Sequence, residues 1–307
     1  MFSIKSRMII PDYLKPGDKI CFVSPSGKIE PEKVKSACHL LEKEKFIVSV
    51  GKNTFEQHFQ FAGTDNQRLE DLQQALDDSE CKAIFCTRGG YGAIHIAGQI
   101  NFNKFLNHPK WLIGFSDITV LHALLQKEGV CSIHGAMCAY YYEENKPSVS
   151  YKELLKTLKG EKKPVILPSV PENRTGYAKG PLTGGNLSLL YSLIGTPFEM
   201  KTEGRILFIE DLSEYLYHID RMMYSLRLSG KLKNIAGLIV GQMTELKDNN
   251  SPFGQNVREI IINAVKGYDY PVCFNYPAGH VKLNLPLKLG AEHSLSITSE
   301  NVIFREI

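Results

Sequence analysis

A serine stands where an expected strand, residues 111–115, turns directly into an expected helix, residues 118–127. A serine on such a turn is held above the edge of a sheet, with its hydroxyl exposed and helix N–H groups beneath it, which suits a nucleophile. The segment Gly114-Phe115-Ser116 lacks the second glycine of a full nucleophile elbow, because Ile118 occupies that place. Ser116 could instead be an ordinary cap of the helix that follows.

A glycine-rich turn, Thr87 to Ala93, also lies between an expected strand and an expected helix. Glycines let backbone N–H groups come close to an anion, either a phosphate or a developing oxyanion. The spacing matches neither of the common phosphate-binding patterns, Gly-x-x-x-x-Gly-Lys-Ser/Thr and Gly-x-Gly-x-x-Gly. The turn could therefore supply oxyanion donors from Gly89 and Gly90, or simply pack a helix against a strand.

Two neighbouring carboxylates, Glu210 and Asp211, end a third apolar segment. Ligand sites of open α/β sheets gather at the carboxyl ends of the strands, and either carboxylate there could hold a histidine in one tautomer. His280 follows a glycine in an expected exposed loop. His134 and His218 border candidate segments and are weaker candidates. Alternatively, Glu210 and Asp211 are simply an acidic pair at the start of a loop, and His280 is a surface histidine.

Serine, carboxylate and histidine thus occur in the order Ser116, Glu210, His280, each after an expected strand. The α/β-hydrolases use this order, although unrelated folds share such triads, so the order alone proves little.

The elements that must position these residues alternate between strands and helices. This alternation predicts a parallel sheet covered by helices on both faces, followed by a second domain. We expect a nucleophile domain at 1–142, a proline-containing crossover at 143–179, and a C-terminal domain at 180–307 that carries the acid and the base. Strands are expected at 19–24, 46–50, 82–86, 111–115, 130–133, 206–209, 235–240 and 272–275 and in the tail 287–304, with helices at 31–44, 66–77, 118–127, 151–158, 187–193, 216–228 and 256–265.

Composition excludes several classes of protein. The 307 residues are 43% hydrophobic and 22% charged, which is ordinary for a globular protein and excludes a disordered or fibrous chain. The net charge of +3 gives no reason to expect a nucleic acid or a membrane surface as partner. Seven cysteines without zinc-ligand spacing, no secretion signal and no long apolar segment predict a cytoplasmic protein without a metal or an organic cofactor.

Five segments together resemble the L,D-carboxypeptidases, the serine peptidases that include muramoyltetrapeptide carboxypeptidase and the microcin C immunity hydrolases. The resemblance extends from about Pro16 to the C-terminus. It is carried by Arg88-Gly89-Gly90-Tyr91-Gly92, Gly114-Phe115-Ser116-Asp117-Ile118-Thr119, Gly184-Gly185-Asn186-Leu187, Leu207-Phe208-Ile209-Glu210-Asp211 and Gly279-His280-x-x-x-Asn284-x-Pro286-Leu287.

The resemblance implies an N-terminal parallel α/β domain, a smaller β-rich α/β domain and an active site between them. It implies that Ser116 is the nucleophile, Glu210 the acid and His280 the base. The backbone N–H groups of Asp117, Gly89 and Gly90 would then receive the oxyanion.

The implied reaction removes the terminal D-alanine from a murein tetrapeptide during peptidoglycan recycling. Arg88 is a candidate for the substrate carboxylate by position only, and a homodimer is expected at the level of the family. An immunity-type hydrolase of aminoacyl sulfamoyl adenylates, or a muropeptide-binding protein without activity, remains the alternative.

Overall fold

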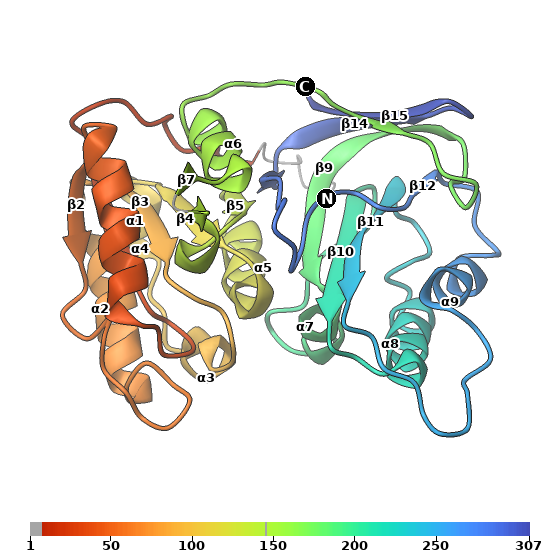
Figure 1. Ribbon diagram of the computed structural model, residues 1–307, viewed down its shortest axis with the longest axis horizontal. Helices are drawn as coiled ribbons and strands as arrows, with labels where there is room; N and C mark the ends of the chain where they lie inside the picture. The colour runs from red at the N-terminus through yellow and green to blue at the C-terminus, as the bar shows by residue number, and fades with distance from the viewer. Residues whose placement is uncertain (1–7, 145) are drawn as a thin grey trace, which may run out of the picture. The chain divides into compact units, whose positions relative to one another are not determined.

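The computed structural model describes residues 8–144 and 146–307 and divides the chain into two units. Unit 1 comprises Met1–Glu161 and Leu285–Gly290, and unit 2 comprises Lys162–Asn284 and Ala291–Ile307. The division falls inside the expected crossover, and a short segment near the C-terminus belongs to unit 1. In Figure 1 the colour passes from red to green through most of unit 1 and from green to blue through unit 2.

Unit 1 is a doubly wound α/β fold. Its sheet has the strand order β13-β5-β4-β3-β1-β2, in which every pair is parallel except β13 with β5. The strands are β1 (Lys19–Val23), β2 (Ile47–Val50), β3 (Cys81–Cys86), β4 (Trp111–Gly114), β5 (Ser132–His134) and β13 (Leu287–Leu289). The helices are α1 (Pro31–Lys43), α2 (Asp65–Asp77), α3 (Ala93–Ala97), α4 (Asn103–Asn107), α5 (Thr119–Lys127) and α6 (Val149–Leu158).

The strand order reverses between β1 and β3, so the chain turns to opposite sides after these two neighbouring strands. Such a reversal leaves a crevice at the carboxyl ends of the strands, where open α/β sheets bind their ligands. The turns after β1 and β3 meet there, since the amide of Gly27 donates to the carbonyl of Gly89 at 3.0 Å. The glycine turn that the sequence singled out therefore lies at the reversal point of the sheet.

Helix packing in unit 1 follows the apolar stripes of the sequence with one difference. In α1 the buried side chains include Val34, Ala37 and Leu41, as the spacing predicts. The apolar spacing also predicts Cys38 on this face, but Leu40 is buried there instead and Cys38 is only half-buried. The central strands β1, β3 and β4 are buried along almost their whole length, which is typical of a sheet covered on both faces.

Unit 2 contains a mixed seven-stranded sheet with the order β12-β11-β10-β9-β14-β15-β8. The first four strands in this order are parallel and the remaining pairs are antiparallel. The strands are β8 (Val165–Pro168), β9 (Gly176–Asn186), β10 (Ile206–Leu212), β11 (Gly237–Thr244), β12 (Val272–Cys273), β14 (Glu292–Ile297) and β15 (Asn301–Glu306). The helices are α7 (Leu187–Ser192), α8 (Leu216–Leu228) and α9 (Val257–Ala264), of which α8 and α9 pack side by side (Figure 1).

The parallel half of this sheet positions the candidate residues of unit 2. β9 runs beside β10 in a register that pairs Asn186 with Glu210, so both residues lie at the carboxyl ends of their strands. The predicted helix 216–228 is α8, with the same bounds. Of the predicted tail, Leu287–Leu289 pairs with β5 of unit 1, while residues 292–297 and 301–306 form β14 and β15.

Candidate active site

Ser116 sits in a strained backbone conformation between β4 and α5. Its φ angle is +63°, a left-handed value that non-glycine residues adopt at a cost of about 1–2 kcal/mol. It is not the cap of the helix, because it lies inside a short 3₁₀ turn, Ser116–Ile118, whose N-cap residue is Phe115. Its hydroxyl makes no hydrogen bond within the described part of the chain. A strained, partly exposed serine with an uncommitted hydroxyl suits nucleophilic chemistry better than capping.

The glycine turn lies directly against Ser116. A methyl group at Gly89 would lie 2.8 Å from Cβ of Ser116, 3.0 Å from its Oγ and 3.3 Å from the amide nitrogen of Asp117. Only a residue without a side chain fits this approach. Among residues 8–144 and 146–307, no acceptor is bound by the amides of Gly89, Gly90 and Asp117. These N–H groups are thus available to an oxyanion formed at Ser116.

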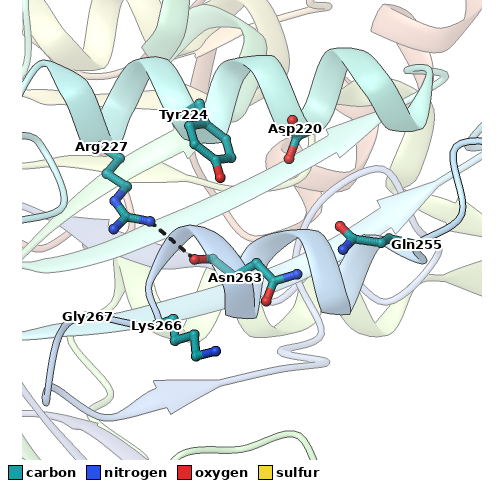
Figure 2. A pocket seen from close by; sticks show the side chains of 7 residues that line it. All are labelled: Asp220, Tyr224, Arg227, Gln255, Asn263, Lys266 and Gly267. Atoms are coloured by element: carbon teal, nitrogen blue, oxygen red, sulfur yellow. Dashed lines mark hydrogen bonds between the residues drawn. The ribbon is translucent and has the colours of Figure 1, made fainter.

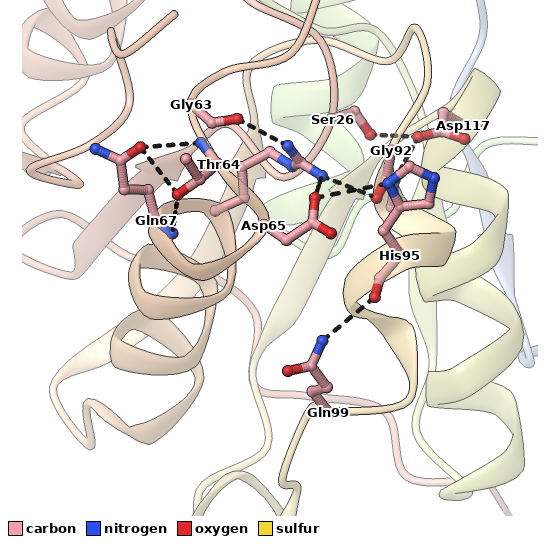
Figure 3. A network of polar contacts seen from close by, with 11 residues as sticks. Ser26, Gly63, Thr64, Asp65, Gln67, Gly92, His95, Gln99 and Asp117 are labelled. Carbon is pink, nitrogen blue, oxygen red and sulfur yellow. Dashed lines mark hydrogen bonds and ion pairs between the residues drawn. The ribbon is translucent and has the colours of Figure 1, made fainter. Parts of the chain in front are cut away.

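A buried carboxylate next to the serine braces this turn. The side chain of Asp117 is 1% exposed, and its Oδ2 accepts hydrogen bonds from Ser26 Oγ at 2.5 Å and from the amide of Ala93 at 2.8 Å. Figure 3 shows the hydroxyl of Ser26 next to the carboxylate of Asp117. Burial raises the pKa of Asp117, and these two hydrogen bonds favour its ionised form. The side chain of Asp117 therefore ties Ser26 and the first residue of α3 to the turn that contains Ser116.

In unit 2, the structure brings His280 to Glu210. The Nδ1 atom of His280 lies 2.8 Å from Oε2 of Glu210, whose side chain is completely buried, whereas that of His280 is 10% exposed. The other carboxylate oxygen, Oε1, has no hydrogen-bond partner among the described residues. A buried carboxylate on Nδ1 fixes the imidazole tautomer that carries its proton there and leaves Nε2 as the acceptor.

The loop that carries His280 is tied down by residues on both sides. Gly279 has φ +125°, and a methyl group there would lie 2.9 Å from Oε2 of Glu210, so the glycine permits the histidine to approach. The amide of Gly279 donates to Oδ1 of the fully buried Asn284 at 3.1 Å, and the amide of Gln242 in β11 donates to the carbonyl of Ala278. These contacts explain the spacing Gly279-His280-x-x-x-Asn284.

Asp211 has different partners from Glu210. Its carboxylate accepts from Nδ2 of Asn186 and from the amides of Ser188 and Leu212, each at 2.9 Å. Burial, with a further contribution from the charge of Glu210, raises the pKa of Asp211 to about 7. Asp211 thus holds the start of α7, while Glu210 faces the histidine. The sequence left both carboxylates open as partners of a histidine, and the contacts favour Glu210.

The remaining candidate residues make no hydrogen bond to Ser116 or Glu210 that the structure describes. Arg88 is exposed and donates from Nη1 to the carbonyl of Lys28 at 2.7 Å, so its role in binding a carboxylate stays a prediction. His218 is bonded to Glu214 at 2.5 Å and His134 is buried in β5. No group of three potential metal ligands was found in the described residues, and none of their helices is long and apolar enough to span a membrane.

One hollow of unit 2 is separate from these residues. It has a volume of about 490 Å³ and lies between α8 and α9 (Figure 2). Its lining contains none of the candidate residues and consists of Asp220, Tyr224, Arg227, Gln255, Asn263, Lys266 and Gly267. The hollow therefore does not belong to the candidate site.

Sequence reasoning missed Arg68, which bonds to the glycine turn from α2. Its guanidinium is buried, and Nη2 reaches the carbonyl of Gly92 at 3.4 Å. A signal was present, because Arg68 precedes Leu72 and Leu76 at a spacing of four residues and so shares their buried helical face. A cation on an apolar face needs a partner in the interior.

Comparison with known proteins agrees with this architecture. Residues 20–135 match the model of the LD-carboxypeptidase N-terminal domain, and residues 179–295 match that of the C-terminal domain. A probable murein peptide carboxypeptidase of Bacillus subtilis is 33% identical over 298 residues, which are 95% of this chain and 93% of the relative. The microcin C7 self-immunity protein MccF of Escherichia coli is 23% identical, over 99% of this chain and 97% of that protein.

A solved structure gives the same result at the level of the fold. The muramoyltetrapeptide carboxypeptidase of Oxalobacter formigenes superimposes with a TM-score of 0.86 and 26% identity, over 94% of this chain and 98% of that one. The chain belongs to the LD-carboxypeptidase family and is a serine-type peptidase of that family.

Proposed function

We propose that this enzyme removes the terminal D-alanine from murein tetrapeptides by way of an acyl-enzyme on Ser116. The observation that carries the proposal is the 2.8 Å contact between His280 and the fully buried Glu210. Such a pair forms the acid and base of a serine hydrolase. The names of the carboxypeptidase relatives support the murein peptide as substrate.

In the first half of the proposed reaction, Nε2 of His280 accepts the proton of the Ser116 hydroxyl while Oγ attacks the scissile carbonyl carbon. Glu210 stabilises the imidazolium that forms. The amides of Asp117, Gly89 and Gly90 donate to the oxyanion, and a single donor of this kind is worth about 3 kcal/mol, or roughly two powers of ten in rate. The C–N bond then breaks, and His280 gives its proton to the departing amine of D-alanine.

In the second half, His280 removes a proton from water, and the resulting hydroxide equivalent attacks the acyl carbon. The ester bond to Ser116 breaks, the serine recovers its proton from His280, and the shortened peptide leaves with a new carboxylate. The free carboxylate of the terminal D-alanine needs a cationic or N–H partner, and Arg88 is exposed and beside the glycine turn. We therefore propose Arg88 for this role.

We further propose that the enzyme acts in the cytoplasm on fragments recycled from peptidoglycan. The seven cysteines are free thiols, and six of them are buried, which supports a reducing compartment. The homodimer expected from the resemblance stays a prediction.

One observation favours a second candidate, hydrolysis of an aminoacyl sulfamoyl adenylate by the same three residues. Tyr215 and Tyr217, shortly after Glu210, are 38% and 37% exposed, with ring centroids 5.5 Å apart. Exposed aromatic rings are surfaces on which a nucleobase can stack. Trp111 cannot serve in this way, because it is completely buried. The relation to MccF supports the same candidate.

A parallel assay separates the two candidates. Purified enzyme is offered the free tetrapeptide L-Ala-γ-D-Glu-meso-diaminopimelate-D-Ala and, separately, an aminoacyl sulfamoyl adenylate, and mass spectrometry follows the release of alanine or of the amino acid. We expect alanine release by the wild type and by Ser192→Ala, whose hydroxyl only bonds within α7, and none by Ser116→Ala. Release from the adenylate alone would establish the second candidate, and turnover of either compound by Ser116→Ala would refute the proposed nucleophile.

A further inference from the structure

A single peptide group between Gly92 and Ala93 is held at both ends by buried charged side chains. Its carbonyl oxygen accepts from Nη2 of Arg68 at 3.4 Å, and its N–H donates to Oδ2 of Asp117 at 2.8 Å. The two side chains come from different elements, α2 and the turn after β4. Because a peptide group is planar, bonds at its two ends fix its plane and hence the direction in which the chain enters α3.

Arg68 is itself held in place. Its side chain is fully buried, Nη1 donates to the carbonyl of Gly63 at 2.9 Å, and Nη2 donates to Oδ1 of Asp65 at 2.6 Å. Its guanidinium also lies over the ring of Phe61, 4.9 Å from the centroid. In Figure 3 the dashed lines from Gly63, Asp65 and Gly92 meet at the guanidinium group of this arginine. Nε of Arg68 has no hydrogen-bond partner among the described residues, so the buried charge depends on the contacts of Nη1 and Nη2, and losing them would be costly.

The segment that needs this support is rich in glycine. Residues 89, 90 and 92 are glycines, and Gly90 and Gly92 have φ angles of +102° and +130°. Glycine loses more conformational freedom on ordering than any other residue, so its turn does not hold its own geometry. At Gly89, however, the turn must lie within van der Waals contact of Ser116. The amide of Gly27 holds the carbonyl of Gly89, and the fixed peptide group between Gly92 and Ala93 holds the turn a second time, three residues further along the chain.

We propose that Arg68 and the side chain of Asp117 are positioning residues that fix the Gly89–Gly90 amides relative to Ser116. The inference rests on the proposed function, because it assigns these amides to the oxyanion. Asp117 then acts twice: its backbone N–H is one donor, and its carboxylate orients the turn that supplies the other two, the amides of Gly89 and Gly90. We call Arg68, the carboxylate of Asp117 and the peptide group between them the clamp. Within unit 1 it links the amide of Asp117 to the amides of Gly89 and Gly90.

The proposal predicts a specific kinetic signature. Oxyanion donors act on charge that develops in the transition state, so displacing them lowers kcat and leaves KM nearly unchanged. Removal of one donor costs about 100- to 1000-fold in kcat. We expect a displaced donor to cost less, about 10- to 100-fold, in Arg68→Met and in Asp117→Asn. Arg68→Lys keeps the charge but loses the two-pronged geometry, so it should recover only part of the rate.

The matched control is Arg174→Met. Arg174 is also an arginine that holds backbone carbonyls, here those of Tyr268, Tyr270 and Val265 in unit 2, and it bonds to none of the candidate residues. Its loss should lower the melting temperature and leave kcat per folded molecule unchanged. Asp117→Asn is close to the wild type in shape, and it provides a second test if Arg68→Met does not fold.

The experiment measures kcat and KM on the tetrapeptide, or on the aminoacyl sulfamoyl adenylate if that is the compound hydrolysed in the parallel assay. Near-ultraviolet circular dichroism gives the folded fraction of each variant. A fall in kcat at constant KM in the Arg68 and Asp117 variants, but not in Arg174→Met, supports the clamp. Unchanged kcat per folded molecule in Asp117→Asn and Arg68→Lys would overturn it. If the wild type and Arg174→Met hydrolyse neither compound, the proposed function fails instead.

Discussion

The carboxyl ends of the parallel strands carry different kinds of candidate groups in the two units. In unit 1 the edge offers backbone amides and one strained serine, arranged by glycines at the reversal point of the strand order. In unit 2 the edge offers side chains, a buried glutamate and a histidine in contact with it. The mechanism proposed above takes its oxyanion donors from unit 1 and its acid–base groups from unit 2.

The two edges share one device. In each, the residue directly after the candidate catalytic residue is a buried aspartate, Asp117 after Ser116 and Asp211 after Glu210. Both aspartates accept backbone amides, Asp117 from Ala93 and Asp211 from Ser188. The hydrogen-bond partners of a carboxylate at a strand end therefore indicate its role. Asp117 and Asp211 each hold a backbone segment in place, whereas Glu210 contacts His280.

The largest expected contrast lies between the adjacent carboxylates of unit 2. Glu210→Gln should lower kcat by about 1000- to 10,000-fold, because the amide no longer fixes the tautomer of His280 or stabilises its charged form. Asp211→Asn should lower kcat less than about tenfold, because Asp211 bonds to Asn186 and the start of α7. Steady-state kinetics on both variants test this, and the reverse order of effects would mean that Asp211 is the acid.

In unit 1 the corresponding test is Gly89→Ala. The added methyl would lie 3.0 Å from Oγ of Ser116 and 3.3 Å from the amide of Asp117, so it displaces either the turn or the hydroxyl. We expect kcat to fall about 100-fold or more, as for loss of an oxyanion donor. Gly267→Ala is the control, because its nearest neighbour would be 4.0 Å away. Equal activity of the two variants would remove the glycine turn from the site.

The smallest predicted effects concern stability, and they have opposite signs in the two units. In unit 1, burial lowers the pKa of His122 from 6.5 to about 4, between Ser132 Oγ and the carbonyl of Gly114. The unfolded chain binds the proton more readily, so this contribution to the free energy of unfolding is present above pH 6.5 and is lost as the pH falls towards 4.

In unit 2, the raised pKa of Asp211 acts in the other direction. Because its pKa is about 7 in the folded protein and 3.8 ordinarily, its contribution is full below pH 4 and is lost as the pH rises to 7. Denaturant unfolding at pH 4 to 8 checks both signs. The stability difference between wild type and His122→Gln should grow with pH, whereas that between wild type and Asp211→Asn should shrink. Parallel slopes would contradict the assigned burial of the two groups.

Local sequence patterns were sufficient for most elements that carry the site. Helix 216–228 follows from its apolar spacing, and the turns at Ser116 and Gly89 follow from glycine and serine placed after apolar strands. Both carboxylates were found at the end of β10. These features depend on neighbours in the chain, which the sequence displays directly.

Contacts between residues far apart in the chain could not be predicted from local sequence patterns. Alternation along a strand points adjacent residues to opposite faces, so Glu210 and Asp211 must differ, but the sequence does not say which one meets residue 280. The pairing of β13 with β5 joins segments about 150 residues apart and places Leu285–Gly290 in unit 1. The contact of Arg68 with Gly92 is of the same kind.

A double-mutant cycle on Ser116 and His280 tests most directly whether the candidate groups of the two units work as one catalytic device. Residues that act as a unit are strongly non-additive: each single loss in a serine hydrolase costs up to about a millionfold, and a second loss adds little. We predict that Ser116→Ala/His280→Ala retains the same residual rate of D-alanine release, within a few-fold, as either single variant. Substantial activity in His280→Ala, or a double variant whose loss is the product of the two single losses, would contradict the account.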